Sequence, residues 1–482
     1  MKKIVIFIFV LFIPFFVFAQ ENSSDLENEL FGGDEDTLIS AEEASSENKS
    51  GLKFKADLEK ATLSLESKKM RIGGNLSSSM GIDYAWVDPY SKKDDYLKSF
   101  KDGKGTFNTI LNGSLFFDAR PNENLKLYGK FLFGFPFEKS LSGALTVPKN
   151  SFGPLQPNDI SLPIGVNGAA NIKIQELYTD FSAKNIAFFR FGKHAVKWGT
   201  GYFYSPADVI NISRIDPQDP TADREGGISL RTHIIIPKTQ HNIWLYMLPP
   251  GQGEDFDPKY TAGAAKGEFV VGNWELGFGG WYKYEKAPRL ITTVSGSIAG
   301  KVAVFGEGVF AWGSDYTYYK ADMSSYTEKN KPFFQATLGG SYSNADTNTS
   351  IALQYFYNGF GYSNTDASTS ILEKAEDPVL LSDASFRRKF QNVLAMGNRG
   401  QHYIALNISQ NKLGTDKLSL NLFQQFAISE LEGFSKLTFN WKIYKFASMS
   451  TGPSFSYPLS PSSKTKGEVR YSLSFRLGGG TF

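Results

Sequence analysis

Apolar and polar residues alternate along most of the chain after about residue 71. In the segment 469–477 the odd-numbered positions hold Val, Tyr, Leu, Phe and Leu, whereas the even-numbered positions hold Arg, Ser, Ser and Arg. The segments 436–443 and 274–284 repeat the pattern. Because successive side chains of a β-strand point to opposite faces, this period of two predicts strands with one apolar and one polar face.

The predicted strands are long, and the connectors between them alternate in length. The strands run for about 10–13 residues, which exceeds the usual strand length and suits tilted strands that cross a membrane. Tight turns fall at 120–124, 183–185, 237–240, 272–273, 299–300, 345–348 and 411–416, and long connectors at 88–106, 138–170, 199–226, 313–331 and 363–401. A large soluble β-protein would also show alternating strands, but short turns alternating with long loops are typical of an outer-membrane barrel.

We therefore expect an all-β fold, a transmembrane antiparallel up-and-down β-barrel that spans residues 71–482. It should have about 18 strands, with 16–18 allowed, and an even number places both termini in the periplasm. The strands should begin near residues 71, 107, 125, 171, 187, 227, 241, 259, 274, 289, 301, 332, 349, 401, 417, 434, 446 and 467.

The N-terminal segment carries export signals. Two lysines precede an apolar run that ends in a small residue, so residues 1–19 are predicted to be a cleaved signal peptide. No later apolar run is long enough for a membrane-spanning helix. Residues 20–50 hold ten acidic residues against one lysine and are expected to be a disordered periplasmic segment, while residues 51–70 form a linker that could be strand or helix. These features predict a protein of the outer membrane of a double-membrane bacterium.

The composition suits a barrel and offers little catalytic chemistry. Aromatic residues make up 15% of the chain, and cysteine is absent although the chain is exported. The four histidines do not stand at metal-ligand spacing, and the sequence has no nucleophile elbow, phosphate-binding loop or clustered basic surface for nucleic acid. We therefore predict no enzymatic activity, no catalytic residue, no cofactor or metal site and no nucleic-acid partner.

Charges on the polar strand faces are the candidates for the lining of a pore. They are Lys126, Lys130, Glu176, Asp180, Arg190, His194, Glu268, Glu275, Lys283, Glu307, Lys436, Lys442, Arg470 and Arg476. Barrel closure brings the last strand beside the first, so the cations near 126–130, 436–442 and 470–476 are expected to form one basic wall opposite a mixed wall over 266–307. The basic wall predicts a preference for anionic solutes. The alternative is that these charges only hydrate a water-filled pore and do not select between solutes.

Two strands around a tight turn at 183–185 carry facing charges. An odd-length turn places Asp180 opposite Arg190, and Glu176 opposite His194. These side chains are expected either to line the lumen or to satisfy one another in an internal ladder.

The segment 197–210, KWGTGYFYSPADVI, is the candidate constriction. We expect Trp198 to mark the outer end of a strand, Gly199 and Gly201 to allow a sharp turn, and Ser205 to cap a short helix with Pro206 in its first turn and Asp208 at its third position, ending near residue 211. This loop, which also includes Asp216, Asp219 and Arg224, is predicted to fold toward the lumen and narrow it.

The motif residues of this segment resemble a family. Arg190 and Gly192, then Trp198, Gly199 and Gly201, then Pro206, Asp208 and Val209, then Asp216, Pro217, Asp219, Pro220, Arg224 and Gly227 resemble a motif of bacterial outer-membrane porins of the alginate-export type. The resemblance covers under a tenth of the chain. It implies an eighteen-stranded pore and does not identify the solute, so alginate is not inferred.

The C-terminal Phe482 resembles the signal read by the barrel assembly machinery, and outer-membrane lipid and small polar solutes are the other expected partners. A bulge at the glycines 478–480 would bring Phe482 into phase with the apolar face of the last strand.

The expected function is a channel for passive diffusion of small hydrophilic solutes. A barrel whose surface loops act as a binding protein or adhesin, or a transporter of hydrophobic compounds, are the alternatives, and the sequence gives no oligomeric state.

Overall fold

The computed structural model describes residues 70–87, 103–122, 124–136, 171–183, 186–250, 257–375, 377–460, 463 and 467–481. The predicted signal peptide, the acidic segment, nearly all of the linker 51–70, and Phe482 lie outside these ranges. So do most of the long connectors 88–106 and 138–170.

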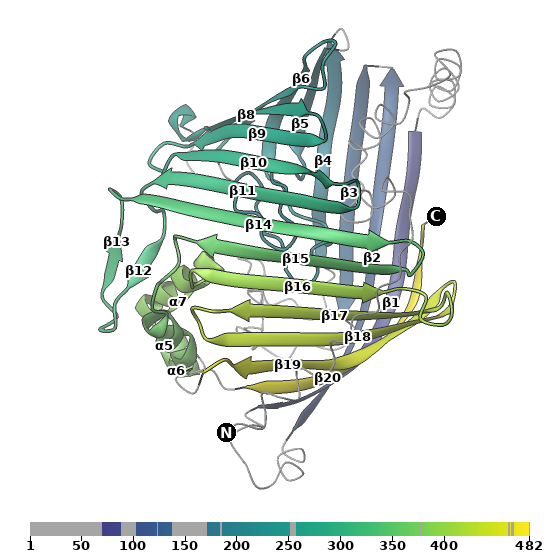
Figure 1. Ribbon diagram of the computed structural model, residues 1–482, viewed down its shortest axis with the longest axis vertical. Helices are drawn as coiled ribbons and strands as arrows, with labels where there is room; N and C mark the ends of the chain where they lie inside the picture. Colours follow the sequence, from purple (N-terminus) through teal and green to yellow (C-terminus); the bar gives the residue numbers. More distant parts are fainter. Residues whose placement is uncertain are drawn as a thin grey trace.

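Eighteen antiparallel strands form one sheet that closes on itself (Figure 1). Each strand pairs with its neighbours in the sequence, and the first strand pairs with the last. The strands are β1 (Met70–Val87), β2 (Lys104–Asn122), β3 (Leu125–Pro136), β4 (Asn171–Ala183), β5 (Ala187–Lys193), β6 (Ile228–Ile235), β7 (Asn242–Leu248), β8 (Ala262–Val271), β9 (Trp274–Tyr282), β10 (Arg289–Ile298), β11 (Val302–Trp312), β14 (Pro332–Asn344), β15 (Thr349–Asn358), β16 (His402–Gln410), β17 (Leu418–Ala427), β18 (Glu432–Tyr444), β19 (Ala447–Pro458) and β20 (Glu468–Thr481). The predicted barrel and its strand number are confirmed.

The closing seam between β1 and β20 contains the predicted bulge. Tyr84 lies opposite Tyr471 and Ser77 opposite Gly478, but Asn75 lies opposite Thr481, so β20 holds one extra residue. Gly478 has a φ of 92°, which glycine adopts readily and other residues do not. The extra residue reverses the alternation at the end of β20.

The two faces of the sheet differ in chemistry. Exposed apolar side chains cover the outer face, as Ile72, Leu76, Met80 and Ile82 do on β1. The inner face carries polar and small residues together with the aromatic side chains that pack against an internal loop. A closed sheet leaves no unpaired edge, and an apolar outer face allows it to stand in lipid.

One end of the barrel carries the folded connectors (Figure 1). The hairpin β12 (Thr317–Tyr319) and β13 (Ser325–Thr327) lies there beside α5 (Asp366–Lys374), α6 (Pro378–Ser382) and α7 (Ala384–Met396). A 3-10 turn, η1 (Pro258–Tyr260), follows β7. Asp383 caps α7 by accepting a hydrogen bond from the backbone of Phe386 at 2.7 Å, and Phe390 and Ile371 are buried in a shared core of α5 and α7. We call α5–α7 with β12–β13 the cap.

Among the described residues, no helix combines the length and apolarity that a membrane crossing requires. The short turns gather at the end opposite the cap, where β1 begins and β20 finishes.

Candidate functional site: a strap inside the barrel

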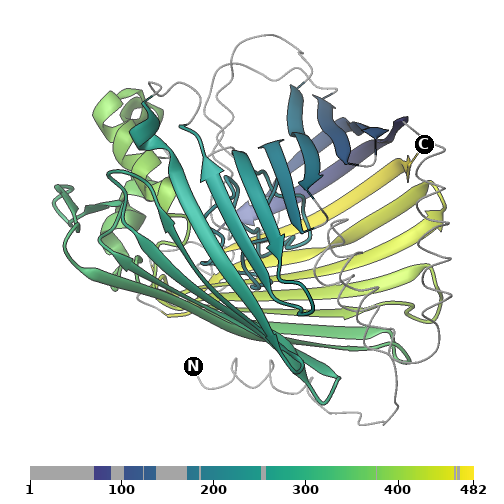
Figure 2. The same ribbon diagram turned by 90° about the horizontal axis from the view of Figure 1, so that it is seen from above.

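The connector between β5 and β6, residues His194–Gly227, lies inside the barrel (Figure 2). Its side chains and backbone contact the inner faces of strands on opposite sides of the lumen, as described below. We call this segment the strap.

Glu307 on β11 holds the first half of the strap. Its Oε1 accepts hydrogen bonds from the backbone N–H of Thr200 at 2.6 Å and of Gly201 at 2.5 Å, and from the hydroxyl of Ser205 at 2.9 Å. Its Oε2 accepts one from the N–H of Ala207 at 2.8 Å. The carboxylate is only 5% exposed, so it lies under the strap rather than on a water-filled wall, which corrects the prediction that Glu307 lines the pore.

Two glutamines hold the next part of the strap. Gln354 on β15 accepts from the backbone N–H of Phe203 at 2.6 Å and of Tyr204 at 3.3 Å, and donates to the carbonyl of Tyr204 at 2.6 Å. Gln425 on β17 donates to the hydroxyl of Tyr204 at 2.8 Å. Both glutamine side chains are buried, and Gln354 satisfies the backbone N–H groups of Phe203 and Tyr204 where the strap meets the wall.

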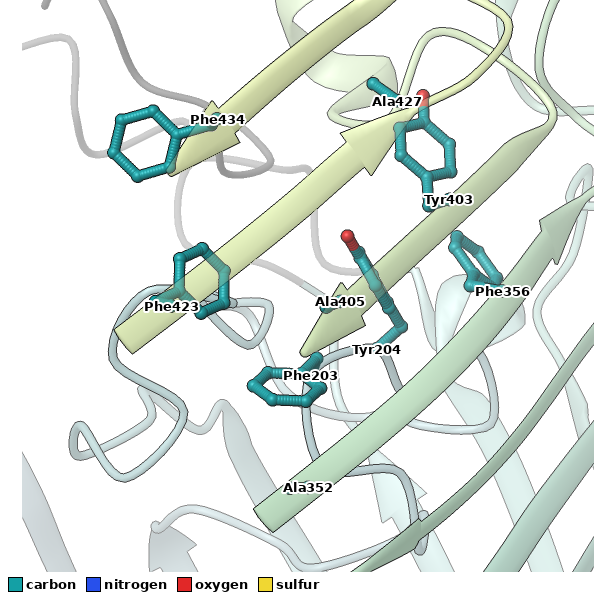
Figure 3. Packing of buried hydrophobic residues seen from close by; sticks show 9 residues of the cluster. All are labelled: Phe203, Tyr204, Ala352, Phe356, Tyr403, Ala405, Phe423, Ala427 and Phe434. Carbon is teal, nitrogen blue, oxygen red and sulfur yellow. The ribbon is translucent and has the colours of Figure 1, made fainter. Parts of the chain in front are cut away.

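An aromatic cluster packs around these hydrogen bonds (Figure 3). The ring of Tyr204 stacks on Phe356 with centroids 5.1 Å apart, and Phe203 meets Phe423 at 5.9 Å. The cluster consists of Phe203, Tyr204, Ala352, Phe356, Tyr403, Ala405, Phe423, Ala427 and Phe434. It fixes the strap to β15–β18 by apolar burial as well as by hydrogen bonds.

Trp198 is not at the outer end of a strand, as the sequence predicted. β5 ends at Lys193, and Trp198 is 1% exposed, packed edge-on against Tyr246 with the carbonyl of Trp198 accepting a hydrogen bond from Lys266 at 2.9 Å. The strap therefore turns inward before it can reach a membrane boundary.

The predicted helix from Ser205 to about residue 211 is not formed. Residues 205–208 make a single turn, in which the N–H of Asp208 donates to the carbonyl of Ser205 at 3.1 Å. Ser205 donates its hydroxyl to Glu307 instead of capping a helix, and Asp208 binds Arg224 at 2.5 Å and the amide of Asn211. Glu307 also accepts from the N–H of Ala207, which the Ser205 side chain would have capped at the start of the predicted helix.

Gly199 and Gly201 are required by close approach rather than by an unusual φ. A Cβ on Gly199 would lie 2.0 Å from the Ser205 hydroxyl and 2.4 Å from the Glu307 carboxylate, and one on Gly201 would lie 1.9 Å from the carbonyl of Tyr204. Neither residue has a positive φ. The two glycines let the strap backbone wrap around the carboxylate.

The second half of the strap returns to the opposite wall through ion pairs. Asp223 pairs with Lys130 on β3 at 2.6 Å, and Glu225 pairs with Lys173 on β4 at 2.6 Å and with Lys193 on β5 at 2.7 Å. Partial burial alone would raise the pKa of Glu225, but the hydrogen bonds from the two lysines lower it below its ordinary value.

The tip of the strap reaches the cap. Arg214 donates hydrogen bonds to the carbonyls of Met396 at 2.5 Å and Ala395 at 2.9 Å, at the C-terminal end of α7, and to the hydroxyl of Tyr316 at 2.9 Å. A cation is favourable at this end of a helix. Asp216 and Asp219, which were predicted in the constriction, are both exposed and close a local turn in which the N–H of Asp219 donates to the carbonyl of Asp216.

The predicted charges on β3–β5 are paired with acids. Arg190 pairs with Asp180 at 2.7 Å in the predicted register, which is confirmed. Lys126 lies 3.6 Å from Asp118, so Lys126 and Lys130 do not extend an unbalanced basic wall as expected.

Glu176 and His194, which were predicted to lie opposite each other, also contact other groups. Glu176 accepts from the N–H of Ala195 at 3.3 Å, while His194 is fully buried and its ring nitrogens face the carbonyl of Gly192 and the hydroxyl of Ser229. His194 is therefore a buried core residue and does not line the lumen, which corrects that prediction.

The mixed wall also differs in detail. Glu268 on β8 binds Lys266 at 2.8 Å and accepts from the Trp244 indole at 2.6 Å. Glu275 is half-buried on β9, and Lys283 lies in the connector just past the end of β9 rather than within a strand. Within the described ranges, no group of three or more acidic or histidine side chains is placed to hold a metal ion.

The inner face from β18 to β20 forms two rows of cations separated by serines. Lys436, Ser454 and Arg470 lie directly opposite one another on adjacent strands, and so do Lys442, Ser448 and Arg476. Arg470 binds Glu468 at 3.0 Å. Among the described residues, the side chains of Lys436, Lys442 and Arg476 have no acidic partner.

Several residues that hold the strap were not singled out from the sequence. Gln354, Gln425 and Arg214 stand at ordinary polar positions of alternating strands or in a long connector, and their partners lie between 102 and 221 residues away. The closely spaced Gly199 and Gly201 were the one sequence signal that the strap backbone approaches another group.

No protein-family profile matches the chain, and no curated protein sequence matches it. Solved structures of similar shape include Acinetobacter baumannii OccAB1, which is 11% identical over 84% of this chain and 96% of that chain with a TM-score of 0.45. Pseudomonas aeruginosa OccK8 (OprE) is 11% identical over 84% and 98%, with a TM-score of 0.43. Pseudomonas aeruginosa OpdK, solved with vanillate, is 8% identical over 85% and 99%, with a TM-score of 0.45.

Proposed function

We propose that the protein is an outer-membrane porin for the passive diffusion of small hydrophilic solutes. The observation that carries the proposal is the uneven attachment of the strap: it is fixed against strands between β7 and β18 and tied back to β3–β5, while the inner face of β18–β20 carries serines and cations. A water-filled path beside β18–β20 would be bounded by polar side chains on one side and the strap on the other.

Anionic solutes suit this path best. Lys436, Lys442 and Arg476 have no acidic partner among the described residues, whereas the cations on β3–β5 are paired. The three charges would lower the free energy of an anion in the path and raise that of a cation.

The same proposal includes the topology of the chain in the envelope. Residues 1–19 would direct export and be removed, the short turns and both chain ends would face the periplasm, and Phe482 would be read during assembly. The resemblance of the segment 190–227 to porins of the alginate-export type supports the choice of a pore and leaves the solute open.

Reconstitution of the full chain tests the proposal. We expect stepwise single-channel currents in planar bilayers and uptake of small sugars or carboxylates into proteoliposomes, measured by osmotic swelling. A correctly inserted barrel that neither conducts ions nor admits solutes would refute the porin function and leave a surface-binding role for the cap.

A further inference from the structure

Glu307 is a buried carboxylate whose four hydrogen-bond donors all come from the strap. Three are backbone N–H groups, of Thr200, Gly201 and Ala207, and the fourth is the Ser205 hydroxyl. Thr200 and Gly201 are successive residues, and successive backbone N–H groups that converge on an anion form a nest, a binding site for negative charge. Here the nest belongs to a connector, and the anion belongs to a strand of the barrel wall.

The shape of the contact is specific as well as its charge. Positions 199 and 201 have no room for a Cβ. At position 199 it would collide with the Glu307 carboxylate, and at position 201 with the carbonyl of Tyr204. On the wall, Glu307 lies between two further glycines, 306 and 308, and the hydroxyl of Thr200 also donates to the carbonyl of Gly306 at 3.3 Å. The strap is thereby held at one height and one distance from β11.

We infer that Glu307 is the positioning residue that sets the width of the pore, because it holds the strap in the lumen through a carboxylate that an amide cannot replace. This inference rests on the proposed function as a pore. A glutamine at position 307 could present only one oxygen, so its NH2 group would face at least one strap N–H, and donors cannot pair with donors. An alanine would leave all four donors without their partner.

The test uses two readouts of the full-length barrel. The chain has no cysteine, so the single substitution Ala207→Cys, at a fully buried position, reports on strap docking by the rate at which the introduced thiol reacts with a water-soluble thiol reagent. Planar-bilayer conductance and the size limit for uncharged sugars or polyethylene glycols, measured without the added cysteine, report on pore width.

Four hydrogen bonds to one carboxylate predict large effects of its removal. With Glu307→Ala added, the introduced thiol should react about tenfold faster or more than in the parent A207C chain, and conductance and size limit should both rise. Glu307→Gln should lie between Glu307→Ala and the parent. Asp118→Asn is the matched control, because it neutralises another buried inner-wall carboxylate that binds Arg120 and Lys126 and does not contact the strap, and it should leave the labelling rate within about twofold.

The outcomes separate the two proposals. Equal labelling rates in Glu307→Ala and the parent, or an unchanged size limit in Glu307→Ala, would overturn the inference, as would an equal effect of Asp118→Asn. A parent barrel that does not conduct would refute the porin function instead, while the labelling rates would still decide whether Glu307 anchors the strap.

Discussion

Replacing Lys442 and Arg476 by glutamine removes the row of cations nearest the short-turn end. Both side chains lie on the inner face at the same level, two strands apart with Ser448 between them, so their backbones are about 10 Å from each other. The substitutions keep a polar side chain at each position, although glutamine is shorter than lysine or arginine. They change the net charge of the path by −2 and leave the strap contacts in place.

The size of the effect follows from the barrel geometry. Eighteen strands spaced by about 4.8 Å and tilted by about 40° give a barrel radius of about 18 Å, and a path between the wall and the strap runs about 10 Å from the charges. At that distance each charge is worth about 0.4 kcal/mol in water, and screening at 0.1 M salt reduces it to about 0.15 kcal/mol. Two cations then separate anions from cations by about 0.6 kcal/mol, or about threefold in permeability.

The reversal potential across a planar bilayer in a potassium chloride gradient measures this ratio. We expect about threefold anion preference near 0.1 M salt, about sevenfold near 0.01 M, and almost none near 1 M, because the screening length shortens from about 30 Å to about 3 Å. The double variant should lose most of the preference at low salt. Its control replaces Lys238 and Lys412, two exposed cations of the short turns, by glutamine.

Three results would refute the reasoning about the cation rows. They are a cation-selective parent channel, an anion preference that persists in 1 M salt, and a control variant that loses as much selectivity as the double variant.

Deleting Pro206–Asp219 should raise the single-channel conductance, because it removes the strap segment beyond the Tyr204 anchor; an unchanged current would show that this segment does not limit the pore. Arg214→Ala removes the contacts between the strap and the C-terminal end of α7, so hydrogen–deuterium exchange in α7 should accelerate, and exchange at the parental rate would contradict that coupling. The pairing of Glu225 with Lys173 and Lys193 lowers its folded pKa, so this contribution to stability is complete above the ordinary value of 4.5 and is lost as pH falls through the lower folded pKa. Open-channel noise should therefore stay constant from about pH 8 to 5 and rise below the ordinary pKa, and Glu225→Gln should abolish that acid dependence.

The strands were predictable because each one carries its own signal. Alternation over ten residues and a turn at one end locate a strand without knowledge of its partners, and barrel closure then follows from the even, sequential pairing. The bulge of β20 was predictable for the same reason, since three glycines interrupt an otherwise regular pattern.

The strap was predictable only in its location. The residues Ser205, Pro206 and Asp208 are a sound local signal for a helix. The Ser205 hydroxyl binds Glu307 instead of a helix N-terminus, and Asp208 binds Arg224 and Asn211, so tertiary contacts override the local preference. Similarly, alternation assigned Lys126 and Lys130 to the inner face, but it could not reveal that Asp118 and Asp223 neutralise them. The pairing of Lys130 with Asp223 joins residues 93 positions apart and depends on the path of the strap. Such a pairing produces no periodic pattern in the sequence from which it could be predicted.

The position of the strap in the chain has a consequence for assembly. Its ion-pairing partners Lys130 and Lys173 precede it in the sequence, whereas Lys266, Glu307, Gln354 and Gln425 all follow it. Contacts between distant parts of a chain form late, since the loops that join them must close first. The strap therefore cannot reach its final place until β17 has joined the sheet. An incompletely assembled barrel passes through a stage in which the strap is not yet docked, and the narrowing of the interior by the strap is a feature that only the nearly complete chain acquires.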